Sequence, residues 1–117
     1  MISGIYNITI EQGSTYKLAL YWKNNANNPI DMTGYTAKMQ IRASTGASVV
    51  LLELSSADTD QIQIYERQGA INLTIGYQQT ANLPPSVAVY DLEVKSPQGI
   101  GNKLIKGRCR IEGEVTR

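Results

Sequence analysis

Apolar and polar residues alternate along the chain in short stretches, and two of the longest lie close together at residues 86–96 and 103–117. Such alternation is typical of β-strands, because successive side chains leave the pleated backbone on opposite faces. Turn-forming residues at 97–102 separate the two stretches, so we predict one long β-hairpin. Its predicted apolar face carries Ala88, Tyr90, Leu92 and Val94 from the first arm and Ile105, Cys109, Ile111 and Val115 from the second.

The charged residues on the opposite face predict how the two arms of this hairpin pair. A register that places Lys95 opposite Lys106 is unfavourable, because like charges then face each other directly. Another register removes this repulsion and sets acidic residues opposite basic ones. The pairs predicted in it are Glu93 with Lys106, Asp91 with Arg108, Val94 with Ile105 and Tyr90 with Cys109.

Six further segments show the alternation of a short strand, and turn-forming residues separate them. They lie at 6–11, 15–23, 35–42, 49–54, around 62–64 and at 70–75. Within the fourth of these segments, Val50, Leu52 and Leu54 are expected to face the core. Residues 76–83 lack alternation and end at two consecutive prolines, so one short helical turn is expected there.

These patterns predict an all-β protein of about eight antiparallel strands. The strands alternate too cleanly to be buried on both faces, which favours a β-sandwich over a small barrel. The sequence contains no internal repeat and no linker, and its 117 residues are enough to bury one core. We therefore expect residues 1–117 to form a single domain.

Composition and charge narrow the class of protein. A net charge of +1 with 42% hydrophobic residues is typical of a globular chain and does not favour nucleic acid or an anionic membrane as a partner. The single cysteine, Cys109, allows no intrachain disulfide and is expected to be buried. No apolar run reaches the roughly 18–20 residues of a membrane helix, and the first residues do not form a signal peptide. A cytoplasmic product is expected.

No catalytic, cofactor-binding or metal-binding residues are predicted. The chain has no histidine and no glycine-rich phosphate loop, so a Ser–His–Asp arrangement and an ordinary zinc site are excluded. Asp58 and Asp60 have the spacing of calcium ligands but are expected to cap a turn. Asp91 and Glu93 share a strand face with basic residues nearby, which keeps both ionised and argues against an acid–base pair. We therefore expect a protein that is not an enzyme and needs no cofactor.

The predicted outer strand faces carry two features that concern binding. The one basic cluster consists of Lys103, Lys106, Arg108 and Arg110. Because no aromatic residues interleave with it, we expect a solvated strand face balanced by Asp91 and Glu93 rather than a platform for nucleic acid. Several apolar residues are also expected to be exposed, either scattered or gathered into a patch for a protein partner. These candidate interface residues are Tyr21, Val49, Leu51, Val87 and Val89.

Several segments of the chain form a recurring set of sequence motifs. Residues 8–42 read ITIEQGSTYKLALYWKNNANNPIDMTGYTAKMQIR, with an EQG turn, an alternating strand that ends in tryptophan and an I-D-L-T-G-Y-T-A-type stretch. Further motifs of the same set are GAINLTI (69–75), QTANL (79–83), VYDLEVKSPQG (89–99) and GEVTR (113–117). Together these motifs resemble small virion proteins of tailed bacteriophages. The resemblance implies an immunoglobulin-like β-sandwich, similar in character to the N-terminal domain of phage baseplate upper proteins, with a structural role in the particle.

Three functions follow as hypotheses. The first is a virion structural protein, made in the host cytoplasm, that assembles into the tail, baseplate or neck with other virion proteins or with copies of itself. The second is a capsid decoration protein with the same fold. The third is a carbohydrate- or receptor-binding module, in which Tyr6, Tyr65 and Tyr77 near predicted loops stack on sugars. None of the three involves nucleic acid or a membrane.

Overall fold

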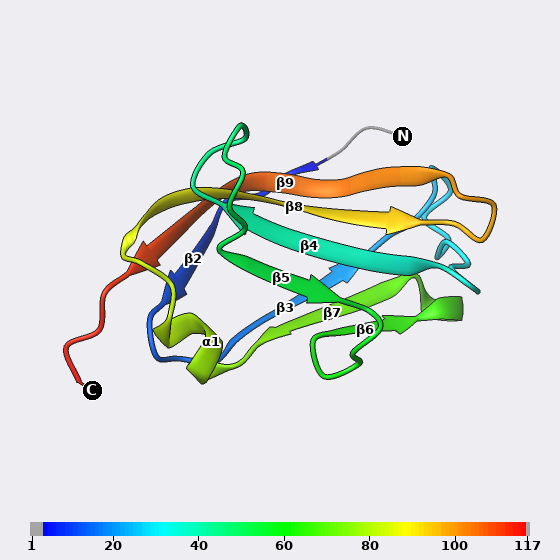
Figure 1. The fold of residues 1–117 in the computed structure, drawn as a ribbon. Helices are drawn as coiled ribbons and strands as arrows, with labels where there is room; N and C mark the ends of the chain where they lie inside the picture. Colours follow the sequence, from blue (N-terminus) through cyan, green and yellow to red (C-terminus); the bar gives the residue numbers. More distant parts are fainter. Residues whose placement is uncertain (1–3, 117) are drawn as a thin grey trace.

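Strands make up about half of the structure, a computed structural model that describes residues 4–116 (Figure 1). Among these residues, six strands form the larger of two sheets: β1 (Gly4–Ile5), β2 (Ile8–Glu11), β4 (Thr36–Arg42), β5 (Leu52–Ser55), β8 (Ser86–Lys95) and β9 (Gly101–Glu112). The smaller sheet contains β3 (Tyr16–Tyr21), β6 (Ile62–Tyr65) and β7 (Ala70–Ile75). The expectation of an all-β protein is therefore confirmed.

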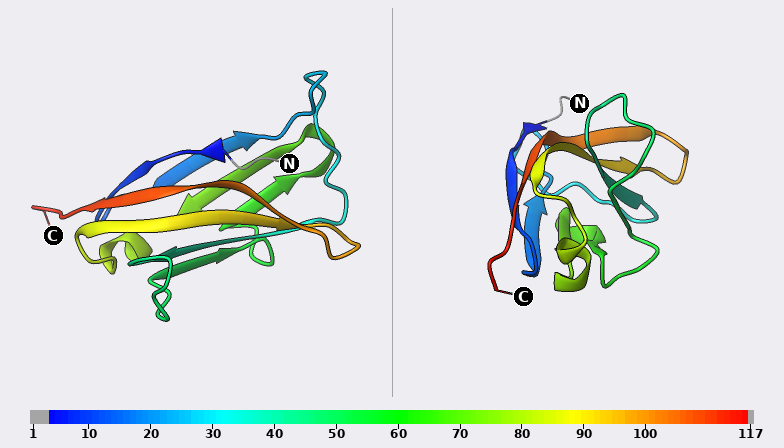
Figure 2. Two further views of the ribbon diagram at one scale, coloured as in Figure 1. Left: turned by 90° about the horizontal axis from the view of Figure 1, so that it is seen from above. Right: turned by 60° about the vertical axis from the view of Figure 1, so that its left-hand side comes forward.

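The chain crosses repeatedly between the two sheets. Strands of the larger sheet follow the order β1-β9-β8-β4-β5, with β2 also beside β9, and the smaller sheet has the order β3-β7-β6. In Figure 1, β9, β8 and β4 lie above β3, β7 and β6, and Figure 2 gives two further views of this arrangement. One apolar core lies between the sheets, with Ile71 and Leu73 of β7 buried together with Met39 and Ile41 of β4.

The predicted faces of most strands are confirmed. Ile8 and Ile10, Met39 and Ile41, and the four β8 residues predicted to face inward are all buried, while the residues that alternate with them lie outward. In 49–54 the prediction holds only in part, because Leu54 is buried but Val50 is 36% exposed. Val115 was expected on the apolar face of the hairpin, but it lies beyond the end of β9 and is 94% exposed.

The predicted register of the hairpin is wrong. Asp91 faces Lys106 instead of Arg108, and the register shifts between Leu92 and Glu93, so that Glu93 faces Lys103. The physical reason is the adjacent pair Leu104 and Ile105, both of which are buried in the core. Two consecutive side chains can point inward only if the strand bulges, and a bulge adds one residue to that strand. The remaining apolar pairs shift accordingly, with Ala88 opposite Cys109 and Leu92 opposite Ile105.

The N-terminal strands also differ from the prediction, because they pair parallel to β9 and not antiparallel. Ile8 lies beside Cys109 and Ile10 beside Ile111, which places both isoleucines in the core. Between β1 and β2, the backbone of Tyr6 passes close to Gly107, where a Cβ atom would collide with the Tyr6 carbonyl oxygen. That oxygen also accepts a hydrogen bond from the Tyr90 hydroxyl.

The expected helical turn within 76–83 is confirmed as α1 (Tyr77–Ala81), and a 3₁₀ helix, η1 (Glu66–Gln68), precedes β7. The fully buried Thr80 of α1 ties this helix to the turn between β2 and β3. Its hydroxyl donates to the Ser14 carbonyl oxygen at 2.9 Å and accepts from the Gly13 amide at 3.1 Å. Among residues 4–116, no helix has the length and apolar character needed to cross a membrane.

Candidate interaction surface

The five candidate interface residues do not form a single patch. Val87 and Val89 project from the outer face of β8, and Val87 is 60% exposed, whereas Val89 is half-buried. Tyr21 is 70% exposed but lies on the smaller sheet, and Val49 is exposed in the connection between β4 and β5. Leu51 was expected to be exposed but is half-buried and packs against the core. The structure thus brings together only Val87 and Val89.

Those two valines lie within a charged outer face formed by β4, β8 and β9. The pairing of these strands sets Val89 between Arg42 and Arg108, and Val87 next to Arg110. One row further along, Asp91 lies between Gln40 and Lys106. Side chains two residues apart on a strand share a face, so these rows form one continuous surface of the larger sheet.

At the hairpin end of this face, opposite charges are paired. Lys103 Nζ lies 2.8 Å from Glu93 Oε2 and 3.4 Å from Asp91 Oδ2. The hydrogen bond with Lys103 lowers the pKa of the Glu93 carboxyl, and the same bond raises the pKa of Lys103. Across the sheet, Lys38 Nζ lies 3.8 Å from Glu53 Oε1. This part agrees with the prediction that Asp91 and Glu93 balance the basic cluster.

Asp91 and Glu93 form no ion pair with Lys106 or Arg108 of the basic cluster. Within residues 4–116, Lys106 and Arg108 form no ion pair, since both nearby acids are engaged by Lys103. Arg42 donates hydrogen bonds to the Ala47 carbonyl oxygen at 2.7 Å and to Gln40 Oε1 at 3.0 Å, and both acceptors are neutral. We call Arg42, Lys106 and Arg108 the basic region. The sequence did not reveal it, because Arg42 is distant along the chain.

An open depression of about 650 Å³ lies over the basic region. Its lining includes all three basic residues together with Val89 and Asp91. Carboxylates and phosphates are the groups that such a surface attracts, since guanidinium and ammonium groups donate charge-assisted hydrogen bonds to them. The depression is therefore suited to contact with an acidic surface.

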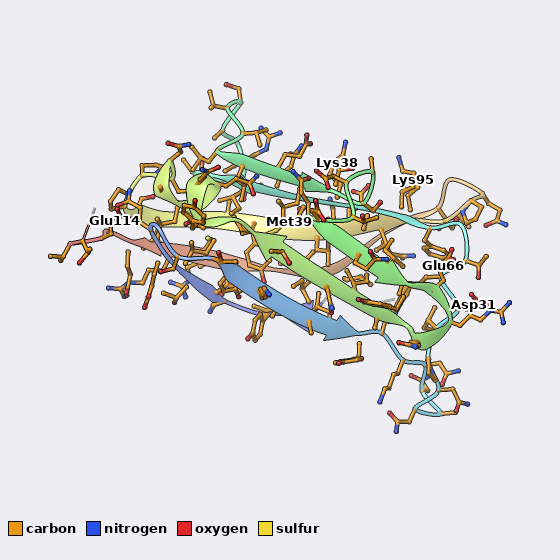
Figure 3. The ribbon with its side chains drawn as sticks, turned by 90° about the horizontal axis from the view of Figure 1, so that it is seen from below. Asp31, Lys38, Met39, Glu66, Lys95 and Glu114 are labelled. Carbon is orange, nitrogen blue, oxygen red and sulfur yellow. The ribbon has the colours of Figure 1, made fainter. Side chains whose placement is uncertain are left out.

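A second charged cluster lies at the opposite end of β9. Glu11 and Glu112 are direct neighbours in the parallel pairing of β2 with β9. Glu114 is held beside them because its amide donates to Gln12 Oε1 at 3.1 Å. We call Glu11, Glu112 and Glu114 the acidic tip. Arg110 Nε lies 3.5 Å from Glu112 Oε1 and offsets part of its charge. Figure 3 shows Glu114 at one end of the molecule and Lys95 toward the other.

Other features of the described residues have a structural explanation. A crevice of about 80 Å³ between the sheets is lined mainly by apolar side chains, among them Trp22 and Leu104. Asp58 Oδ1 accepts from the Asp60 amide at 3.0 Å, which confirms the predicted turn cap. Among residues 4–116, no group of three or more acidic or cysteine side chains is arranged to hold a metal ion.

The three tyrosines considered for sugar binding do not share one platform. Tyr65 ends β6 and Tyr77 begins α1, so the full length of β7, about 20 Å for six residues, lies between them. Tyr6 belongs to the larger sheet, at the junction of β1 and β2. A sugar that stacks on one of these rings cannot contact the other two.

In comparisons with known proteins, no family model matches the chain and no curated protein matches it.

Proposed function

We propose that this chain is a structural protein of a bacteriophage virion that docks through the outer face of its larger sheet. The observation that carries this proposal is the basic region, whose charges lack acidic partners among residues 4–116, next to the exposed Val87. Its role would be that of an assembly or adaptor component of the tail, baseplate or neck. The resemblance of residues 8–42 and of the later motifs to small phage virion proteins supports a structural role of this kind.

We also propose that the fold is an immunoglobulin-like sandwich. Its strand order supports this assignment, because β9-β8-β4-β5 opposite β3-β7-β6 corresponds to strands G-F-C-C′ opposite B-E-D of variable-type domains. Folds of this kind host many unrelated functions, so the assignment supports a scaffold and does not by itself specify a role.

The physical character of the surface favours a protein partner. Arginine is enriched at protein interfaces, and its guanidinium forms bidentate contacts with carboxylates. The residues of the basic region lie on paired strands, so their backbone is ordered before binding and only side-chain entropy is lost there. A nucleic-acid partner is less favoured, since the net charge of the chain is only +1.

The proposal is tested on purified particles of the phage that encodes the chain. We expect mass spectrometry of density-purified virions to detect the protein at a fixed ratio to the major capsid protein. Immunogold labelling would then place it on the tail, baseplate or neck, whereas labelling of the head would favour the capsid decoration protein. Absence from purified virions would contradict both assignments.

A binding measurement tests the surface itself. Purified protein is mixed with virions that lack it, and the bound fraction is compared between the parent chain and the double variant Lys106→Glu, Arg108→Glu. We expect the double variant to bind at least about tenfold more weakly, because two attractive contacts become repulsive. The matched control is Lys17→Glu, which changes an exposed charge on the smaller sheet and should bind like the parent chain.

A further inference from the structure

We infer that the outer face of the larger sheet is complementary to itself, and that two copies of this chain associate face to face through it. The basic region of each copy would contact the acidic tip of the other. This inference rests on the arrangement of charges on the chain and does not depend on a role in a virion. The dimer covers the face that docks in the proposed function, so a virion partner and a second copy would compete for it.

The two charged groups lie on the same face of the same strand. Lys106, Arg108 and Glu112 are all even-numbered residues of β9, and all three are exposed, while Cys109 and Ile111 between them point into the core. Glu112 is four positions after Arg108, which corresponds to about 13 Å along the strand. One face thus carries positive charge at one position and negative charge a short distance away.

In a dimer with twofold symmetry, the basic region and the acidic tip of each copy can both face opposite charge. If the axis lies in the plane between the facing larger sheets of the two copies and passes over Arg110 perpendicular to β9, the two β9 strands run antiparallel. Arg108 of each copy then lies opposite Glu112 of the other. Each copy then sets its acidic tip over the basic region of the other, and the two contacts are identical by symmetry. An isologous interface uses the same patch on both copies, so assembly stops at the dimer.

The residues near this axis are compatible with close approach. Val87 lies next to Arg110 on the neighbouring strand, and Thr9 lies next to it on the other side. Val87 is 60% exposed and would meet its copy across the axis, where apolar side chains are removed from water. Arg110 would also approach its copy, but the Glu112 carboxylate 3.5 Å away offsets that repulsion.

The face is large enough for a stable contact. The principal extents of the molecule are 45, 27 and 24 Å. A standard interface buries about 800 Å² on each partner, which is less than the area of a broad side of a body with these dimensions. A second copy is the occupant whose charge pattern is known to match, because both complementary groups belong to this chain.

Analytical ultracentrifugation of the full chain tests this inference. At about 100 μM protein and about 50 mM NaCl, we expect a mass twice the 12.9 kDa of one chain, which falls toward one chain at about 500 mM NaCl as charge interactions are screened. A monomer in low salt would overturn the inference and would leave the face free for an acidic protein or for nucleic acid. Masses that grow beyond the dimer would overturn the twofold arrangement.

Reversing the charges gives a sharper test. The variant Lys106→Glu, Arg108→Glu and the variant Glu11→Lys, Glu112→Lys should each be monomeric, because both contacts in each homodimer become repulsive. An equimolar mixture of the two should restore the dimer, since each contact in the mixed pair joins opposite charges. A dimer that resists either reversal, or a mixture that stays monomeric, would overturn the inference. Lys17→Glu is the control and should dimerise like the parent chain.

Chemical cross-linking provides a readout that does not depend on those variants. With Val87→Cys, a short bismaleimide should join two copies, because residue 87 lies next to the axis. The native Cys109 is fully buried, so the parent chain should not react. Tyr21→Cys is the control and should not cross-link, since it exposes a thiol on the other sheet. Equal cross-linking of Val87→Cys and Tyr21→Cys would contradict a dimer through the larger sheet.

Discussion

Three weakly acidic side chains lie in the core between the two sheets or against it: Cys109, Tyr90 and Tyr16. Burial raises the pKa of the Cys109 thiol from 9.0 to about 11. Burial also raises the pKa of the Tyr90 hydroxyl, with a further contribution from Tyr16, and burial raises the pKa of Tyr16 itself. All three groups are neutral in the folded chain at physiological pH, so none of them adds a charge to the core.

The shift at Cys109 predicts sensitivity to alkaline pH. The folded chain holds the thiol proton more tightly than the unfolded chain, so the stability linked to it is fully present below the ordinary thiol pKa of 9.0. That stability is lost as the pH rises through the folded value of about 11. We expect the free energy of unfolding in urea to fall steadily over this range. Cys109→Ala should reduce the slope without removing it, because Tyr90 and Tyr16 also titrate.

A thiol reagent gives an independent check of the same feature. At pH about 8 the native protein should not react, because both burial and the raised pKa keep the thiolate population low. One thiol per chain should react after denaturation. Rapid labelling of the native protein would contradict the buried position of Cys109.

Among the elements, the junction of β1 with β9 depends on one small residue. A Cβ atom at Gly107 would lie 2.9 Å from Asn7 Oδ1 and would also collide with the Tyr6 carbonyl oxygen. Asn7 Oδ1 accepts a hydrogen bond from the Arg108 amide at 2.9 Å, and the Tyr6 amide donates to the Lys106 carbonyl oxygen at the same distance. Glycine at this position therefore permits the parallel pairing of the N-terminal strands.

Gly107→Ala should weaken this pairing. We expect a loss of about 1–3 kcal/mol in the free energy of unfolding, which is typical of overpacking. Amide hydrogen exchange should become faster in β1 and β2 before it changes in β7. The matched control is Gly46→Ala in the exposed loop after β4, where nothing lies within 4 Å of the added atom, and its effect should stay within about 0.5 kcal/mol. Equal destabilisation by both variants would contradict the proposed contact.

The accuracy of the sequence predictions also varies at the level of elements. The alternation of apolar residues was sufficient to locate the strands and most of their buried faces, because that pattern is local. Charge pairing alone does not predict the bulge, although Leu104 and Ile105 interrupt the alternation. The parallel pairing of β2 had no local signal, because its partner lies at the other end of the chain.

For the interaction surface too, features set by local sequence spacing could be predicted, and features set by strand pairing could not. The cluster on β9 was recognised from spacing alone, and so were Val87 and Val89 on β8. Which basic groups remain without an acidic partner depends on side-chain distances across three strands. The contribution of Arg42 and the position of Glu11 beside Glu112 depend on how strands pair, and sequence spacing carries no information about that.

At the scale of the whole molecule, the apolar layer between the two sheets holds the fold together. Ile71 is fully buried at the centre of β7 and belongs to the same core cluster as Met39 and Leu92 of the larger sheet. Removing its side chain leaves a cavity and loses contacts to both sheets. This layer is where single substitutions should have their largest effect on stability.

Ile71→Ala should therefore lower the free energy of unfolding by about 2–5 kcal/mol, as is typical of a buried isoleucine. The control is Ile100→Ala in the hairpin loop, where the side chain is 62% exposed, and its effect should stay within about 0.5 kcal/mol. Urea denaturation followed by tryptophan fluorescence measures both, since Trp22 packs against the core. A comparable loss in the two variants would contradict this location of the core.

The parallel pairing of β2 with β9 also has a consequence for how the protein is made. Ile8 pairs with Cys109, so the contacts that complete this edge join residues about a hundred positions apart. Contacts of such long range are slow to form, because a large loop must close before any contact is gained. During synthesis, β2 leaves the ribosome long before β9, so its apolar residues stay exposed to solvent until β9 is available for pairing. The nascent chain is therefore an expected substrate for holding chaperones until β9 emerges.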